Sequence, residues 1–284
     1  MIKRSKINAI VCMLFWALFF VGSMSINKVV DKKIPIEIVV LYRLFFGFCG
    51  FLPFIIKNGR NIYKTTVIHL HLLRCLFTAL TMACTYYTYR HLPLAIGTSI
   101  GLSGPLFISI LAAIFLKERL TLKKIGVIVL GYVGVLLVVG PHFSNVDDFQ
   151  PIAIAVLGNI SIGFVVMLMK KITITDSVET TVFYNALLAL LIVACYAAPS
   201  VYIPPLNDLK LLVGIGLCGI TLQFFYTKAI SFEDASFVAP LEYFRILVAI
   251  PVGLIFFHEA INIHQVIGTL IIIFSTYVLT REEK

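Results

Sequence analysis

Apolar stretches of about 20 residues, separated by short polar connections, recur along the whole chain. A helix needs roughly 20 apolar residues to cross a hydrocarbon core about 30 Å thick. Unpaired backbone groups are costly in lipid, and barrel strands would show about ten alternating residues each, so we interpret the stretches as helices. The pattern predicts an all-α integral membrane protein with ten transmembrane helices, at residues 7–27, 34–56, 67–89, 93–116, 122–140, 151–170, 178–199, 208–229, 233–257 and 263–280.

Composition excludes a soluble globule. The chain has 284 residues, of which 60% are hydrophobic and 13% are charged, against roughly 25% charged in an ordinary soluble domain. The first apolar run follows Lys3, Arg4 and Lys6 but is too long for a signal peptide and lacks a small-residue cleavage site, so we expect it to remain as the first span.

The net charge of +9 indicates membrane topology rather than nucleic-acid binding. Most of the 23 Lys and Arg lie in connections that face the cytoplasm when the N-terminus does. The positive-inside rule therefore predicts that both termini of this multi-pass membrane protein are cytoplasmic. The six Cys all lie in apolar runs without metal-ligand spacing, so we expect packing roles, no metal and no cofactor.

An internal repeat divides the chain into halves. Residues 94–122 and 235–263 share a small-residue start, a Pro, an aliphatic run and a terminal Glu, which is Glu118 or Glu259. Each half then contains five spans, and an odd number of crossings inverts the second copy. We expect two inverted five-helix repeats, at 1–142 and 143–284, with substrate bound between them near the midplane.

These features resemble the EamA-type drug/metabolite transporters. The resemblance rests on an Arg in VLYRLFFGFCGFLPF, a Pro-containing fourth span that ends in Lys117-Glu118-Arg119, and a ninth span that reads A-P-L-E-Y and ends in His258-Glu259. Residues 42–105 are also similar to the S-adenosylmethionine uptake carriers of intracellular bacteria. The resemblance implies a secondary carrier with ten helices and a small organic substrate.

Charged residues at membrane depth are the first candidates for the site, because they are costly unless paired or facing a watered cavity. Arg43 and Arg245 lie near the midplane, and Arg74 lies about 10 Å from the cytoplasmic side. Glu242 and Arg245 are spaced i, i+3, so they either pair with each other or contact substrate. Arg43 has no acidic partner in sequence, and we expect it to anchor a substrate carboxylate unless backbone carbonyls satisfy it.

Aromatic and amide side chains at the same depth form a second set. Trp16, the single Trp, lies mid-span and could stack on an organic substrate. Asn159 and Gln223 need hydrogen-bond partners in lipid, which could be another helix or the substrate. The further members are Tyr86, Tyr87, Tyr184, Asn185 and Tyr226, and we take Tyr87 as the candidate ligand among the tyrosines.

Pro105 and Pro240 are expected to kink helices and shape the pathway, since each removes a backbone donor. Glu118 and Glu259 either tie their helix ends to the following turn or carry protons. Gly214–Gly219 matches G-x-G-x-x-G, but it lies inside a span and is expected to serve close helix packing.

The sequence thus predicts a secondary transporter that moves a small organic metabolite by alternating access, with S-adenosylmethionine or an amino-acid-like compound as candidate substrate. An exporter of another substrate, an intramembrane enzyme and a scaffold or receptor subunit remain alternatives. The missing catalytic set disfavours the enzyme. Expected partners are the substrate and the lipid bilayer, not nucleic acid; the sequence leaves the oligomeric state open.

Overall fold

The computed structural model describes residues 4–30, 33–91, 100–118, 121–139, 149–257 and 263–281, and within them the chain forms helices without a strand. The first half contains α1 (Arg4–Val29), α2 (Ile36–Asn58), the 3-10 helix η1 (Gly59–Tyr63), α3 (Ile68–His91), α5 (Gly104–Leu116) and α6 (Leu122–Val139). The second half contains α7 (Phe149–Thr175), α8 (Val178–Ala197), η2 (Ala198–Ser200), α9 (Leu206–Phe232), α10 (Ala235–Val238), η3 (Ala239–Tyr243), α11 (Phe244–Phe257) and α12 (Ile263–Arg281).

The predicted all-α membrane fold is confirmed. Seven helical segments of the described residues are long and apolar enough to cross a membrane, and two more are apolar but shorter. With α6, these segments match the ten predicted spans, most of them within a few residues at each end. Residues 93–99 of the fourth span, and Glu259, lie outside the described residues.

Local sequence explains several helix ends. Pro35 and Pro205 immediately precede α2 and α9, where a missing N–H costs nothing. The Ser177 hydroxyl accepts a hydrogen bond from the Thr180 N–H and so caps α8. Gly59, with a φ of 54°, ends α2 in a conformation that most residues avoid.

Side chains are distributed as a lipid-embedded protein requires. Large apolar residues lie on the outer surface, for example Ile56 with 80% and Phe149 with 79% of the side chain exposed. Polar groups such as Lys6, Arg74 and Asn159 are buried inside the bundle. Apolar exposure on this scale would be unfavourable in water and is satisfied by lipid.

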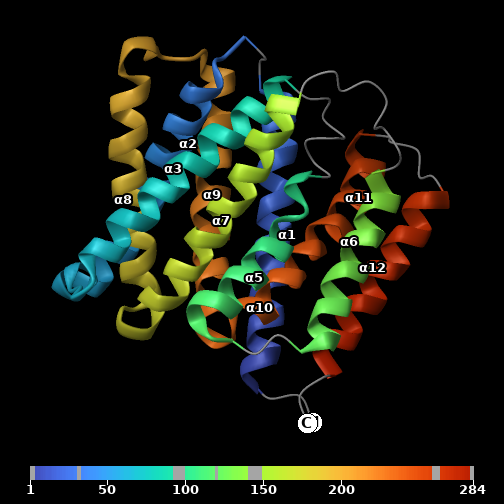
Figure 1. Cartoon of the computed structure of the whole chain (residues 1–284). Helices are drawn as coiled ribbons and strands as arrows, with labels where there is room; N and C mark the ends of the chain where they lie inside the picture. The colour runs from blue at the N-terminus through green and yellow to red at the C-terminus, as the bar shows by residue number, and fades with distance from the viewer. Residues whose placement is uncertain are drawn as a thin grey trace.

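Helices pair reciprocally between the two halves (Figure 1). The first helix of each half packs on the third helix of the other, so α1 contacts α9 and α7 contacts α3. The second helices, α2 and α8, contact each other, and the fifth helices, α6 and α12, lie side by side at one edge of the bundle. This exchange of equivalent partners is the pattern of two inverted five-helix repeats.

Two spans are broken. The ninth span runs through α10, η3 and α11, and Pro240 lies in η3. In the fourth span, Pro105 lies in the first turn of α5 and follows a turn at 102–103, so it begins a helix rather than bending one. Its missing N–H falls where no helical acceptor exists, which is why Pro is favoured there.

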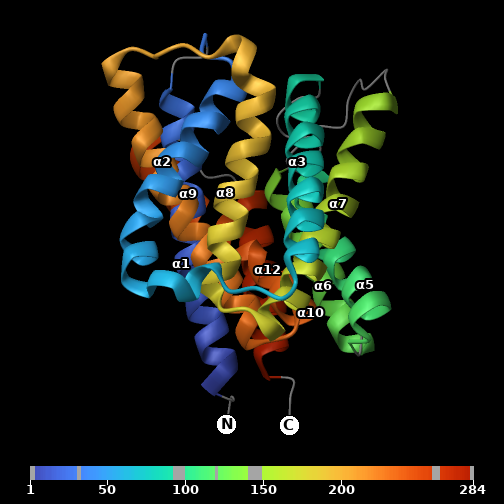
Figure 2. The same cartoon turned by 90° about the vertical axis from the view of Figure 1, so that its left-hand side faces the viewer.

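The helix ends that are predicted to face the cytoplasm lie at one end of the bundle. α1 begins and α12 ends at the same end of the bundle (Figure 2), here called the terminus end. The start of α3 and the turn between α7 and α8 lie at this end too (Figure 2).

Candidate functional site

A cavity lies between α2 and α3 of the first half and α8 and α9 of the second, away from the helix ends. Its volume is about 70 Å³, counted as the space open to the centre of a water molecule. That space suits water rather than a whole metabolite, which needs a few hundred cubic ångströms, so the helices must part to bind one. The lining residues are Arg43, Leu44, Gly47, Phe48, Thr78, Met82, Asn185, Ala186, Ala189, Gly219, Ile220 and Gln223.

Arg43 enters this cavity over a glycine. A Cβ on Gly219 would lie 2.9 Å from Arg43 Nε, so only glycine leaves room for the side chain as placed. No described residue forms a hydrogen bond or an ion pair with the Arg43 guanidinium. An unpaired cation at membrane depth requires either water or an anion, and the cavity can supply both.

Two glycines bring α2 and α9 together around Arg43. A Cβ on Gly216 would lie 2.9 Å from the backbone nitrogen of Gly47 and 3.0 Å from the carbonyl oxygen of Arg43. The helices therefore touch backbone to backbone, as small residues permit in membranes. This contact confirms the packing interpretation of the G-x-G-x-x-G segment.

Amide groups provide the neutral part of the cavity. Asn185 is 9% exposed, and its Oδ1 is buried without a hydrogen-bond partner. Gln223 donates from Nε2 to Thr227 Oγ1 at 3.3 Å. Thr78 donates to the carbonyl oxygen of Arg74 at 2.9 Å. A ligand with N–H groups could satisfy the Asn185 oxygen, whose desolvation is otherwise unfavourable.

A second cluster lies farther along α9 and contains Trp16, Phe20, Tyr226, Glu242 and Arg245. The Tyr226 hydroxyl donates to Glu242 Oε1 at 2.6 Å, and Trp16 lies 5.7 Å from the Tyr226 ring, centroid to centroid. The Arg245 guanidinium lies over the Phe20 ring at 5.3 Å. Gln223 and Tyr226 are spaced i, i+3, so this cluster and the cavity are neighbours on α9.

The suggested Glu242–Arg245 ion pair is not present in the described part of the chain. Glu242 instead takes its hydrogen bond from α9, and Arg245 faces a ring of α1 while its Nε is buried without a partner. Glu242 lies in the 3-10 segment and Arg245 in the α-helix that follows. Each of the two side chains thus has its contact on another helix, Glu242 with Tyr226 and Arg245 with Phe20.

Arg74 and Asn159 lie outside the cavity lining. Arg74 is 1% exposed and donates to the carbonyl oxygen of Thr181 at 3.3 Å, while its Nε and Nη2 are buried without partners. Asn159 donates to Ser103 Oγ at 3.0 Å and to the Ile100 carbonyl oxygen, and so ties α7 to the turn before α5. Tyr87 is half-buried on α3 and does not line the cavity.

Glu118 makes a contact that the sequence did not indicate. Its two carboxylate oxygens accept from the backbone N–H groups of Ala235 at 3.0 Å and Ser236 at 2.9 Å. We expected Glu118 to bind the turn that follows α5. Its carboxylate instead caps the start of α10, in the other half of the chain. Thr78 and Gly219 were also missed as cavity residues; the one available signal was that Gly219 precedes Gln223 by one helical turn.

Comparison with known proteins gives one consistent result. The model of the EamA-like transporter family matches residues 4–140 and again 150–281. A solved crystal structure superposes with a TM-score of 0.78 at 16% identity, covering 98% of this chain and 96% of the other. That likeness concerns the fold.

Curated relatives are transporters. An S-adenosylmethionine uptake transporter of Rickettsia conorii is 30% identical, over 95% of this chain and 92% of its own length. A riboflavin transporter of Brucella anthropi is 23% identical over 88% and 89%. A pseudopaline exporter of Pseudomonas aeruginosa is 26% identical over 92% and 91%. The chain is therefore a carrier of a small metabolite and belongs to the EamA-like transporter family.

Proposed function

We propose that this carrier takes up S-adenosylmethionine, or a similar amino-acid-like compound, across the bacterial inner membrane. Alternating access arises from movement of repeat 1–142 against repeat 143–284. The observation that carries the proposal is the unpaired guanidinium of Arg43 in a cavity between the halves, beside the unpartnered oxygen of Asn185. The similarity to S-adenosylmethionine uptake transporters supports the same substrate.

The chemistry of the two clusters suits such a substrate. A guanidinium binds a carboxylate with two parallel hydrogen bonds, so Arg43 would hold the amino-acid end. The Asn185 oxygen would accept from the substrate ammonium. Along α9, the aromatic cluster and Glu242 would receive the sulfonium and the adenosyl group, because ring faces and carboxylates both attract cations.

The alternatives predict different behaviour of the same protein. If the protein is an exporter of riboflavin-like or pseudopaline-like compounds, those ligands should stabilise it against thermal unfolding, and S-adenosylmethionine should not. An enzyme would convert a substrate without moving it. The described residues contain no group of three or more His, Cys, Asp and Glu side chains that could hold a metal ion.

Topology is part of the proposal. Both termini would be cytoplasmic, which places Lys117 inside and Val201 outside. Single cysteines at these positions, on a background without the native cysteines, should react with an impermeant reagent on opposite sides. Labelling of both from the same side would contradict the inverted arrangement.

Counterflow of labelled S-adenosylmethionine in proteoliposomes tests the function, with riboflavin and unlabelled amino acids as competitors. Loss of hydrogen bonds to a charged group costs about 1.5–3 kcal/mol, so Arg43→Ala should weaken substrate binding roughly 10- to 150-fold. Arg43→Lys should restore little, because lysine lacks the planar fork. Lys210→Ala, an exposed cation on α9, is the matched control. Normal transport by a folded Arg43→Ala protein would remove Arg43 from the site.

A further inference from the structure

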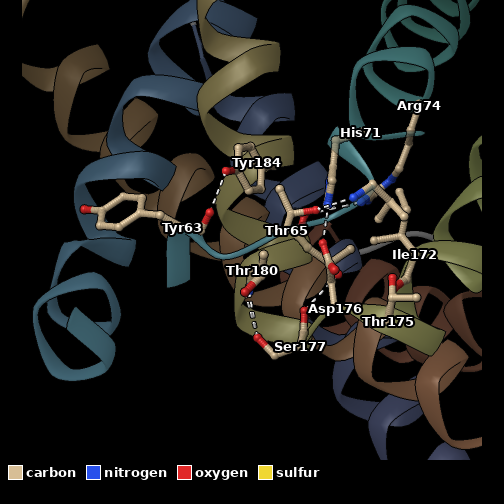
Figure 3. A network of polar contacts seen from close by, with 12 residues as sticks. Tyr63, Thr65, His71, Arg74, Ile172, Thr175, Asp176, Ser177, Thr180 and Tyr184 are labelled. Carbon is tan, nitrogen blue, oxygen red and sulfur yellow. Dashed lines mark hydrogen bonds and ion pairs between the residues drawn. The ribbon is translucent and has the colours of Figure 1, made fainter. Parts of the chain in front are cut away.

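A buried polar network lies at the terminus end of the bundle (Figure 2), and its residues do not line the cavity. Figure 3 shows the network from close by. His71 Nε2 of α3 lies 2.8 Å from Asp176 Oδ2, which lies in the turn between α7 and α8. The side chains of this pair are 1% and 3% exposed. The Tyr184 ring of α8 packs on the His71 ring, with the centroids 4.7 Å apart, and its hydroxyl donates to the Tyr63 carbonyl of η1.

The network ties the two halves of the carrier together. His71 and Arg74 belong to the first half, and their partners Asp176 and Thr181 belong to the second. Alternating access requires the halves to separate at this end in one of the two states. In the separated state proposed here, both contacts would break and water would reach the pair.

The charge of the network depends on one proton. Of the charged and titratable groups described around His71, Asp176 faces it from the turn, Arg74 lies one turn along its own helix and Tyr184 contributes a ring. With a neutral imidazole, Arg74 and Asp176 sum to zero. The carboxylate accepts from Nε2–H, which leaves Nδ1, buried and unpartnered, as the atom open to protonation.

The geometry points to His71 and Asp176 as a proton-binding site whose occupancy favours opening of the terminus end. Protonation at Nδ1 gives the network a net charge of +1 beside Arg74. Burial of that charge is unfavourable, whereas water in the separated state stabilises it. By linkage, the open state then binds the proton more tightly than the closed state. This inference rests on the alternating-access carrier proposed above.

Hydrogen–deuterium exchange on the purified protein tests the site without any substrate. Amide protection in residues 68–75 and 172–178, corrected for chemical exchange, should fall as pH falls from 8 to 5.5. One linked proton changes the equilibrium by up to about tenfold per pH unit. His71→Gln keeps a donor for Asp176 but cannot titrate, so its protection should stay high and independent of pH.

Two variants complete the test. His69→Gln removes an exposed histidine of the same helix and should retain the full pH dependence. Asp176→Asn removes the carboxylate beside Arg74 and should lower protection at every pH. A pH dependence that persists in His71→Gln, or wild-type protection that does not change with pH, would overturn the proposal.

Transport separates this inference from the proposed function. In proteoliposomes, the pH dependence of S-adenosylmethionine counterflow should disappear in His71→Gln while counterflow itself remains. Counterflow that keeps its pH dependence in this variant would contradict the site. Absence of S-adenosylmethionine transport in the wild type would refute the proposed substrate, and the exchange measurement would still decide whether the proton site exists.

Discussion

Alanine at Gly216 should push α2 and α9 apart. Its Cβ would lie 2.6 Å from the Cβ of Phe46, 2.9 Å from the backbone nitrogen of Gly47 and 3.0 Å from the carbonyl oxygen of Arg43. Carbon atoms pack best at about 3.5–4.0 Å. None of these three atoms can move by rotation about a side-chain bond, so the helices themselves must shift.

The size of the effect follows from two opposing terms. Overpacking a tight contact costs about 1–3 kcal/mol, and replacing glycine by alanine in a helix contributes about 1 kcal/mol of stability. Gly126 of α6 is the matched control, because a Cβ there would meet no atom within 4 Å. Both variants gain the same stability from replacing glycine by alanine in a helix. Gly216→Ala should therefore be less stable than Gly126→Ala by about 1–3 kcal/mol, the cost of overpacking.

Unfolding in mixed detergent micelles, followed by circular dichroism, measures this difference. The wild type and both variants are titrated under the same conditions, and the free energies of unfolding are compared. Equal stability of Gly216→Ala and Gly126→Ala would refute the close contact between α2 and α9. It would also refute the position of Arg43 beside the glycines of α9.

Three further predictions concern other contacts. Gly219→Ala should displace the flexible Arg43 side chain, so transport should fall at least several-fold in a proteoliposome assay while stability changes by less than about 1 kcal/mol. Tyr226→Phe and Glu242→Gln should not be additive; a double-mutant cycle on unfolding should give a coupling of about 0.5–3 kcal/mol, and additivity would show that their hydrogen bond contributes nothing. Glu118→Ala leaves two backbone N–H groups of α10 without their acceptor and should destabilise the protein by about 1–3 kcal/mol in the same unfolding titration, an effect that Glu118→Gln should reduce by retaining one acceptor.

Hydropathy predicts the helices well because lipid leaves the backbone few alternatives. The errors occur where a charge was taken as the end of a span. The sixth span was expected to end at Lys170, yet α7 continues to Thr175. Lys170 Nζ donates to the carbonyl oxygens of Ile230 at 2.9 Å and Glu233 at 2.6 Å, so carbonyls at the end of α9 satisfy a charge that seemed to require water.

Contacts between distant segments explain what the sequence could not predict about the site. The sequence suggested Arg245 as the partner of Glu242, but the hydrogen-bond partner of Glu242 is Tyr226 on another helix. Glu118 likewise reaches α10 in the other half. Depth in the membrane indicates which residues need a partner, while the packing of the two repeats decides which partner they meet.

The three intramembrane arginines illustrate this distinction, because the same signal has three structural answers. Arg74 donates to a backbone carbonyl in a fully buried network, and Arg245 lies over the ring of Phe20. Arg43 differs from both, because it borders a cavity and has no described partner. Arg74 and Arg245 also keep nitrogens without hydrogen-bond partners, but neither residue lines the cavity. The Arg43 guanidinium borders the cavity, where a carboxylate could form charge-assisted hydrogen bonds with it. Arg43 is therefore the arginine at which a substrate carboxylate would contribute most to binding.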